Sequence, residues 1–143
     1  MKILLAACNA KYIHSNLAVY DLKAYSSDYD EHVILREYTI NQPKDEILKD
    51  IYSSGADVVC FSCYIWNIEQ IRKLAADLKM ACPELLLTAG GPEASSRGPA
   101  FARENPWVDF VLRGEGEYPF YRLCQVLHEP QRALETVPGL IYR

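Results

Sequence analysis

The sequence lacks the features that mark membrane proteins and nucleic-acid-binding proteins. No apolar run approaches the roughly 20 residues that a membrane-spanning helix requires. Lys and Arg are scattered singly along the chain instead of forming a basic stripe, and the formal net charge is −4. A phosphate backbone would be repelled rather than attracted by such a surface. We therefore expect neither a membrane nor a nucleic acid as a partner.

A secretion signal and a disulfide framework are lacking as well. The apolar start of the chain is short, and Asn9, Lys11 and His14 follow it where a signal peptide would have small residues for cleavage. The 5 cysteines are odd in number and mostly lie inside apolar segments, which is typical of reduced, buried thiols. The sequence thus predicts a cytoplasmic protein whose residues 2–8 form a first strand.

Motifs of the common catalytic sites are also missing. There is no dinucleotide-binding Gly-x-Gly-x-x-Gly, no Gly-Lys-Ser/Thr phosphate loop, no serine elbow and no pair of zinc-binding histidines. The phosphoacceptor site of a receiver domain needs acidic residues after its first and third strands, where this chain has Asn9 and Ser62. Cys60 and Cys63 form a lone Cys-x-x-Cys, but residues three apart on a strand point to opposite sides. That spacing argues against a metal or redox pair.

What the chain does contain is a regular alternation of strand-like and helix-like segments. Apolar runs of strand length occur at residues 2–8, 32–38, 57–62, 85–89 and 108–112. Segments with helical periodicity lie between and after them, at residues 15–25, 44–53, 67–80, 99–104 and 118–128. This alternation predicts a doubly wound, flavodoxin-like or Rossmann-like α/β fold, with a parallel sheet of five strands and helices on both faces. Residues 137–142 are a candidate sixth strand.

Local signals add detail to this expectation. Residues 3–7 and 58–61 are apolar without alternation, as expected for central strands covered on both faces. Residues 32–38 carry charges and should lie nearer an edge. At the start of the third helix, Asn67 is the expected N-cap, with Gln70 as its capping-box partner.

The unusual residues of the chain gather where a ligand would bind in such a fold. Ligands of open α/β sheets bind beyond the carboxyl ends of the strands, where the strand order reverses. The loops expected there contain Asn9, Tyr12, His14, Ser62, Tyr64, Trp66, Gly90, Gly91, Pro92, Glu93, Gly114 and Glu115. Each also has a structural interpretation: the glycine pair permits a tight turn, and the carboxylates favour a helix N-terminus.

Together these loops resemble a known family. His14, Ser62 and the pair Gly90–Gly91 are similar to the spaced signature of cobalamin-binding domains. More narrowly, residues 9–15, 62–67, 90–93 and 113–117 resemble the N-terminal domain of cobalamin-dependent radical SAM proteins, a group that includes methyltransferases and the anaerobic oxidative cyclase of bacteriochlorophyll synthesis. The likeness spans nearly the whole chain. It implies that the residues named above bind cobalamin, with its nucleotide tail between sheet and helices and its corrin over the strand ends.

The sequence departs from the family's stricter signature around His14. That signature has Asp two residues before the histidine and Gly three residues after it, where this chain has Tyr12 and Leu17. The aspartate would orient an imidazole that ligates cobalt, so its absence argues against ligation. Two interpretations of His14 stay open: a ligand to cobalt, or a residue that only lines the site.

The chain also lacks the other half of a radical SAM enzyme. The 143 residues contain no Cys-x-x-x-Cys-x-x-Cys loop for an iron–sulfur cluster. The resemblance therefore implies that residues 1–143 are the cofactor-holding part of a longer enzyme for methyl transfer or oxidative cyclisation. Its C-terminal radical SAM domain would bind S-adenosylmethionine and a 4Fe-4S cluster.

Two other functions fit the same predicted fold. One is a flavodoxin-like domain that has lost cofactor binding and serves as an interaction or structural module, which the departures around His14 favour. The other is an α/β enzyme for a nucleotide or nucleoside, which the missing phosphate loop disfavours. Only a binding measurement separates these from the first interpretation.

Overall fold

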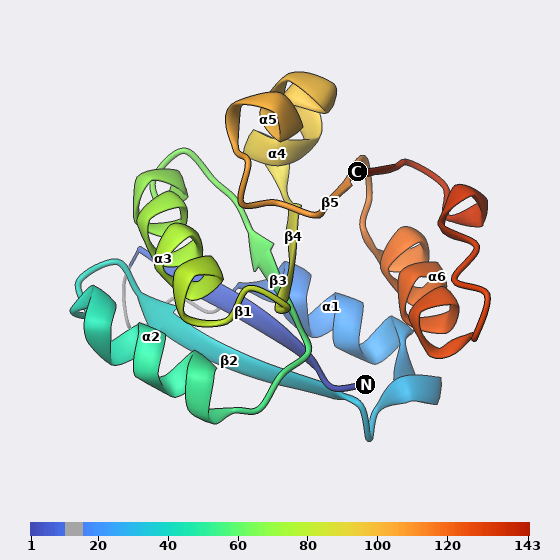
Figure 1. Cartoon of the computed structure of the whole chain (residues 1–143), viewed down its shortest axis with the longest axis horizontal. Coiled ribbons are helices and arrows are strands. Elements are labelled where there is room, and N and C mark those ends of the chain that lie inside the picture. Colours follow the sequence, from blue (N-terminus) through green and yellow to red (C-terminus); the bar gives the residue numbers. More distant parts are fainter. Residues whose placement is uncertain (11–15) are drawn as a thin grey trace.

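A six-stranded sheet runs through the centre of the fold (Figure 1). The computed structural model describes residues 1–10 and 16–143. The strands are β1 (Ile3–Asn9), β2 (Val33–Thr39), β3 (Val58–Ser62), β4 (Leu86–Gly90), β5 (Phe110–Leu112) and β6 (Leu140–Tyr142). Their order in the sheet is β2-β1-β3-β4-β5-β6, so β1 and β3 are neighbours and β2 lies at an edge. The predicted α/β fold and edge strand are confirmed.

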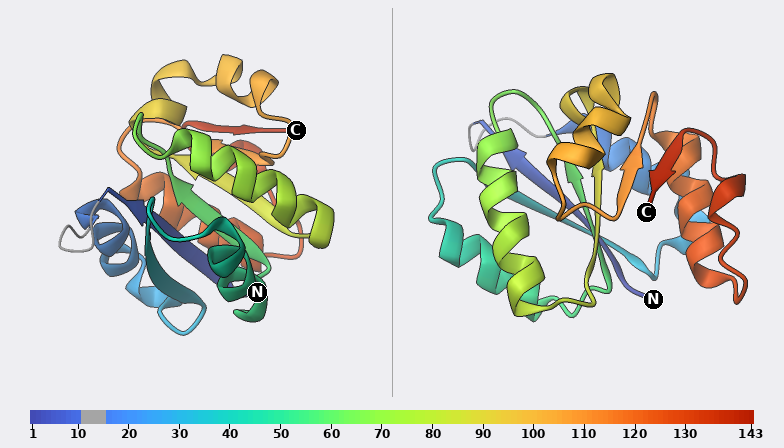
Figure 2. Two further views of the ribbon diagram at one scale, coloured as in Figure 1. Left: turned by 90° about the vertical axis from the view of Figure 1, so that its left-hand side faces the viewer. Right: turned by 45° about the horizontal axis from the view of Figure 1, so that its top comes forward.

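Helices cover both faces of the sheet, as predicted (Figure 2). The helices are α1 (Leu17–Tyr25), α2 (Lys44–Ser53), α3 (Ile68–Ala81), α4 (Pro92–Arg97), α5 (Pro99–Glu104) and α6 (Glu117–His128), with 3-10 turns η1 (Ser27–Tyr29) and η2 (Leu134–Thr136). Helices α1 and α6 pack on one face, while α2, α3, α4 and α5 contribute to the core on the other. Along β3, Val58 and Cys60 join the first of these two cores, and Val59 and Phe61 join the second, because successive side chains point to opposite faces.

The sixth strand differs from the rest of the sheet. β1 to β5 pair in parallel, whereas β6 pairs antiparallel with β5, with Leu112 opposite Leu140. After α6 the chain returns to the carboxyl end of β5, where Arg113 N donates to Gly139 O at 3.1 Å. Because β6 begins at the carboxyl end of β5, it can pair with β5 only in the antiparallel direction. The sheet is therefore six-stranded and mostly parallel.

The predicted capping box at the start of α3 is wrong. No side chain caps this helix, and Gln70 Nε2 instead donates to Thr39 O at 3.3 Å. Asn67 is buried and bonds to the ends of two strands: its Nδ2 donates to Cys8 O at 3.1 Å and to Ser62 O at 3.0 Å. Its Oδ1 accepts from Tyr64 N at 2.8 Å. Asn67 thus joins the carboxyl ends of β1 and β3 to the loop that follows β3.

Helix α4 was not expected from the sequence. Residues 90–93 were predicted to be a loop, but Gly90 ends β4 and Pro92 begins α4. Gly98, with φ of 46° and ψ of −115°, separates α4 from α5, and Pro92 and Pro99 each occupy a first turn. Proline suits that position because its missing N–H would have no helical partner. Within residues 1–10 and 16–143, no helix has the length and apolar character needed to cross a membrane.

Candidate functional site

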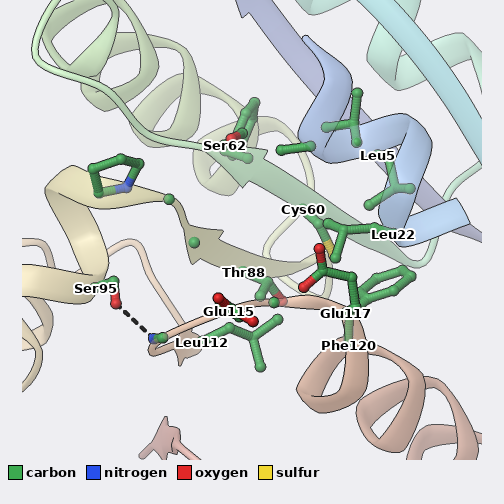
Figure 3. A pocket seen from close by; sticks show the side chains of 18 of the residues that line it. Leu5, Leu22, Cys60, Ser62, Thr88, Ser95, Leu112, Glu115, Glu117 and Phe120 are labelled. Carbon is green, nitrogen blue, oxygen red and sulfur yellow. Dashed lines mark hydrogen bonds between the residues drawn. The ribbon is translucent and has the colours of Figure 1, made fainter. Parts of the chain in front are cut away.

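A cavity of about 570 Å³, here called the slot, opens at the carboxyl ends of the strands between the sheet and the helices α1 and α6 (Figure 3). Its floor is the sheet itself, through Leu5, Cys60, Ser62, Thr88, Gly90 and Leu112. Its walls come from α1 and from the start of α6, including Val19, Leu22, Glu117 and Phe120. Its mouth is formed by Tyr64, Gly91, Pro92, Ser95, Gly114 and Glu115. A volume of this size is typical of small-molecule sites.

Small side chains keep the slot open. Cys60, Ser62, Thr88 and Gly90 lie on the α1/α6 face of β3 and β4, where large apolar residues would fill the space. A Cβ built on Gly90 would approach only Leu112, at 3.9 Å, which is ordinary contact. A side chain at position 90 could therefore be accommodated by the backbone but would project into the slot.

Gly91 has a different role from its neighbour. Its φ is +85°, and a Cβ there would lie 2.8 Å from both the N and the O of Cys63. The two loops cross closely at this point: Cys63 N donates to Gly90 O at 2.8 Å, and Glu93 N donates to Cys63 O at 3.1 Å. Gly91 thus holds the loops after β3 and β4 together and fixes one side of the mouth.

The deepest part of the floor carries two polar groups. Thr88 is 1% exposed, and within the described part of the chain its hydroxyl makes no hydrogen bond of good geometry. Cys60 lies opposite Thr88 on the neighbouring strand, and its sulfur, a weak acceptor, is the group nearest to a partner for that hydroxyl. Burial raises the pKa of the Cys60 thiol to about 12 against the weak hydrogen bond from Thr88, so the thiol is protonated at neutral pH. An unpaired buried hydroxyl costs about 1–3 kcal/mol, which a polar group entering the slot would offset.

A second cavity, here called the outer hollow, lies beside the slot beyond the end of β1. Its volume is about 450 Å³, and its lining includes Asn9, Leu17, Tyr64 and Trp66. Tyr64 lines both cavities. The rings of Tyr64 and Trp66 stack with centroids 4.4 Å apart and an interplanar angle of 11°, although Trp66 is 52% exposed. The two rings therefore present an apolar aromatic surface at the outer hollow.

Acidic and amide groups give this end of the sheet its polarity. Glu115 and Glu117 line the slot, and none of the described residues that line the slot or the outer hollow is Lys or Arg. Asn9 Nδ2 donates to Glu37 Oε1 at 3.1 Å, and Glu37 also accepts from Tyr20 Oη at 2.8 Å. Carboxylates accept hydrogen bonds from amide donors but repel a polyphosphate. The chemistry therefore favours an amide-bearing ligand over a nucleoside polyphosphate.

Most of the predicted site residues come together in this region. The slot gathers Ser62, Tyr64, Gly90, Gly91, Pro92, Gly114 and Glu115, and the outer hollow adds Asn9 and Trp66. Glu93 lines neither cavity. Tyr12 and His14 lie outside the described residues, so the two interpretations of His14 stay predictions.

Sequence reasoning missed several residues of the slot. The main ones are Leu5, Leu22, Cys60, Thr88, Ser95, Leu112 and Phe120. Ser95 supports the mouth, since its Oγ accepts from Gly114 N at 2.6 Å (Figure 3). For Cys60 and Thr88 a signal existed: each lies two residues before a predicted site residue on the same strand, and therefore on the same face.

The two cysteines of the Cys-x-x-Cys motif do not form a pair. Cys60 and Cys63 are both buried, but they belong to the cores on opposite faces of the sheet. The described residues contain no group of three or more His, Cys, Asp or Glu that could hold a metal ion. The divergence expected from strand geometry is confirmed.

Comparison with known proteins gives this site a family. Residues 3–124 match the family of the B12 binding domain. A cobalamin-dependent radical SAM methyltransferase, TokK, from Streptomyces tokunonensis is 36% identical over 87 residues, and the 2-(S-pantetheinyl)-carbapenam-3-carboxylate methyltransferase of Streptantibioticus cattleyicolor is 40% identical over 87 residues. Each match covers 61% of this chain and only 13% of the relative. The anaerobic magnesium-protoporphyrin IX monomethyl ester cyclase of Rubrivivax gelatinosus is 22% identical over 104 residues, which are 71% of this chain and 18% of the cyclase.

Solved structures show the same fold. A cobalamin-binding protein from Desulfitobacterium hafniense DCB-2 superposes with a TM-score of 0.63 at 14% identity, over 87% of this chain and 57% of that one. A type II dehydroquinase from Butyrivibrio crossotus reaches a TM-score of 0.57 at 13% identity, over 90% and 98%. Because these two proteins have different functions, the likeness in fold does not indicate which function this chain has. The sequence match over residues 3–124 does: this chain belongs to the B12-binding domain family.

Proposed function

We propose that this domain holds cobalamin, with the nucleotide tail in the slot and the corrin ring over the carboxyl ends of the strands. The observation that carries the proposal is the slot itself, which opens beside Ser62 and Gly90 and is kept free by small side chains. Its volume of about 570 Å³ between sheet and helices leaves room for a flat base with its ribose. The unpaired Thr88 hydroxyl at the bottom favours a ligand that brings a polar group.

The residues around the mouth suit the corrin. The ring carries amide side chains, which would donate to Glu115 and exchange hydrogen bonds with Asn9. The stacked pair of Tyr64 and Trp66 offers an apolar surface for the ring or its methyl groups. Glu93 and Tyr12 remain proposed contacts from the family resemblance, and His14 remains a proposed neighbour or ligand of cobalt.

We further propose that the domain belongs to a longer radical SAM enzyme. The two methyltransferases are matched over only 13% of their length, which leaves room for another domain. In this proposal a C-terminal radical SAM domain of the same polypeptide binds S-adenosylmethionine and a 4Fe-4S cluster, and the whole enzyme performs methyl transfer or oxidative cyclisation. Bound cobalamin supplies a cobalt centre that can carry a methyl group. The five free cysteines fit a reducing cytoplasm.

Titration of the purified chain with hydroxocobalamin tests the binding proposal. We expect a change in the visible spectrum of the cofactor and its retention through desalting. Gly90→Leu should weaken binding at least about tenfold, because the new side chain fills the slot. Ala81→Leu adds similar apolar bulk at an exposed end of α3 and should bind as the unchanged chain does.

The result also separates the alternative functions. An unchanged spectrum and no retention up to high micromolar cofactor would refute cobalamin binding and favour a domain that has lost its cofactor. Equal binding by Gly90→Leu would refute the placement of the tail in the slot. Stabilisation by nucleotides alone would favour the α/β enzyme, although the acidic mouth disfavours it.

A further inference from the structure

Three small polar side chains form a continuous strip on the floor of the slot. Cys60 and Ser62 lie on β3, and Thr88 lies on β4 opposite Cys60 (Figure 3). Cys60 and Thr88 each lie two positions before the last residue of their strand, Ser62 and Gly90, which places them roughly 6–7 Å deeper than the strand ends at about 3.3 Å per residue. Only the far end of an inserted group can reach them.

The surroundings of this deep end are apolar. Leu5 lies beside Cys60 on the sheet, Phe110 lies beside Thr88, and Phe120 of α6 belongs to the same apolar cluster. Within the described residues, the Thr88 hydroxyl is buried and makes no hydrogen bond of good geometry, since the Cys60 sulfur beside it is only a weak acceptor. A hydroxyl can donate and accept, and a protonated thiol is a weak donor. A ligand whose far edge is purely apolar would leave the Thr88 hydroxyl unpaired, whereas a polar edge would satisfy it.

We propose that Thr88, with Cys60 beside it, makes the slot selective for the lower base of the corrinoid. The preferred base is a purine such as adenine, whose ring nitrogens and exocyclic amine form hydrogen bonds, over 5,6-dimethylbenzimidazole, whose corresponding edge carries two methyl groups. This inference rests on the proposed placement of the nucleotide tail. A site that hydrogen-bonds its ligand discriminates against the analogue that lacks the polar group, because the protein group is then left unpaired.

Binding of three corrinoids tests the selectivity. The chain is titrated with a corrinoid carrying adenine as lower base, with the 5,6-dimethylbenzimidazole form, and with cobinamide, which has no base. We expect the adenine form to bind about 2- to 10-fold more tightly than the benzimidazole form, the range for one neutral hydrogen bond. Thr88→Val keeps the shape of the side chain and should remove the preference, while Thr88→Ser keeps the hydroxyl and should retain it.

Matched controls separate recognition from stability. Thr39 is also buried with an unpaired hydroxyl, but it lies at the end of β2 away from the slot. Thr39→Val should leave the preference unchanged. The original chain and Thr88→Val should bind cobinamide with the same affinity. If Thr88→Val weakens cobinamide binding as much as it weakens binding of the adenine form, the effect is structural and the inference is overturned.

The remaining outcomes are distinct. If no corrinoid binds to the unchanged chain, the proposed function fails and the selectivity fails with it. If both base-containing forms bind equally, or if Thr88→Val does not change their ratio, the selectivity is overturned while cobalamin binding stands.

Discussion

Two adjacent glycines show how much a single residue depends on what lies opposite it. Gly90 has only Leu112 near its missing side chain, whereas Gly91 faces the backbone of Cys63. The sequence does not distinguish the two residues. The close contact between the loops after β3 and β4 decides which of them tolerates a Cβ, and only the structure shows that contact. Replacing Gly90 therefore tests the slot, and replacing Gly91 tests the backbone that frames it.

We predict that Gly91→Ala lowers the free energy of unfolding by roughly 2–3 kcal/mol, because a left-handed φ and a backbone contact are both strained by a Cβ. Urea denaturation measures the loss. Gly55→Ala is the control, since Gly55 has φ of +70° but no described atom within 4 Å of a built Cβ, and it should lose less. Equal losses of unfolding free energy for Gly91→Ala and Gly55→Ala would contradict the role assigned to the close contact between the loops after β3 and β4.

The buried thiols predict a loss of stability at high pH. Burial raises the pKa of Cys8 to about 12 from the usual 9.0. Between these values the unfolded chain releases the proton and the folded chain keeps it. The thiol's contribution to stability is therefore complete below pH 9 and is lost as the pH rises towards 12.

Unfolding free energies measured from pH 8 to pH 11 check this prediction. In Cys8→Ala the unfolding free energy should fall less steeply with rising pH, by up to about 1.4 kcal/mol per pH unit, because the thiol has been removed. Cys82→Ala, at a partly exposed position, is the matched control and should decline as the unchanged chain does. Parallel curves of unfolding free energy against pH for Cys8→Ala and the unchanged chain would show that the buried Cys8 thiol does not cause the decline.

Some residues that line the slot could be predicted from the sequence, and the others could not, for a physical reason. The sequence indicated Ser62, Gly90 and Gly114 because loops at the carboxyl ends of strands are recognisable along the chain. It missed Thr88 because a threonine inside an apolar strand looks like any core residue. Whether its hydroxyl has a good partner depends on the residues that the fold brings beside it, such as Cys60 on β3, and no local pattern reveals these.

At the scale of elements, β2 is fastened to α2 by one polar cluster at the edge of the sheet. Tyr38 Oη donates to Asp50 Oδ2 at 2.6 Å, and Arg36 Nη1 donates to the same oxygen at 2.8 Å. The hydrogen bond from Tyr38, followed by that from Arg36 and its charge, lowers the pKa of Asp50 against the effect of burial. The stabilisation is therefore present above the ordinary carboxyl pKa and is lost as the pH falls through the lowered value.

We predict that Tyr38→Phe destabilises the domain by about 1 kcal/mol at pH 7, the scale of one hydrogen bond to a partly exposed carboxylate. The loss should shrink as the pH falls from 7 through the lowered pKa of Asp50, because protonation removes the charged acceptor. Thermal unfolding over this pH range measures it. Tyr52→Phe, at an exposed position on the same helix, should change nothing, and a loss independent of pH would contradict the charge-assisted bond.

The elements themselves were largely predictable. Periodicity gave α2, α3 and α6, and uninterrupted apolar runs gave the central strands β1 and β3. Helix α4 was missed because its sequence is mostly polar, with Ala94 as its one buried residue, whereas the equally short α5 contains Phe101 between two alanines. Pro92 alone offered a start signal for α4. The direction of β6 was not predictable, since it depends on the path of residues 129–139 and not on the apolar character of the strand.

At the scale of the whole molecule, the walls of the slot come from opposite ends of the sequence. Helices α1 and α6 pack against each other on one face of the sheet. A Cβ on Gly116 would lie 3.2 Å from Leu22 Cδ2, which shows how closely the two walls approach. A ligand in the slot would therefore contact both walls and the sheet between them.

We predict that hydroxocobalamin at 100 times its Kd raises the unfolding free energy by about 2.7 kcal/mol. For a chain of this length the melting temperature should rise by roughly 5–10 °C. Cobinamide at the same concentration should give a clearly smaller shift, because it lacks the part that reaches the slot. Differential scanning fluorimetry compares the two, and equal shifts would place the stabilising contacts outside the slot.

The pairing of α1 with α6 also sets an order of events during protein synthesis. Leu22 leaves the ribosome early, but Phe120, on the facing wall, follows almost a hundred residues later. A nascent chain that has completed β1 to β4 has the floor of the slot without its second wall. If the nucleotide tail occupies the slot as proposed, the cofactor can contact both walls only after α6 has been translated and has docked.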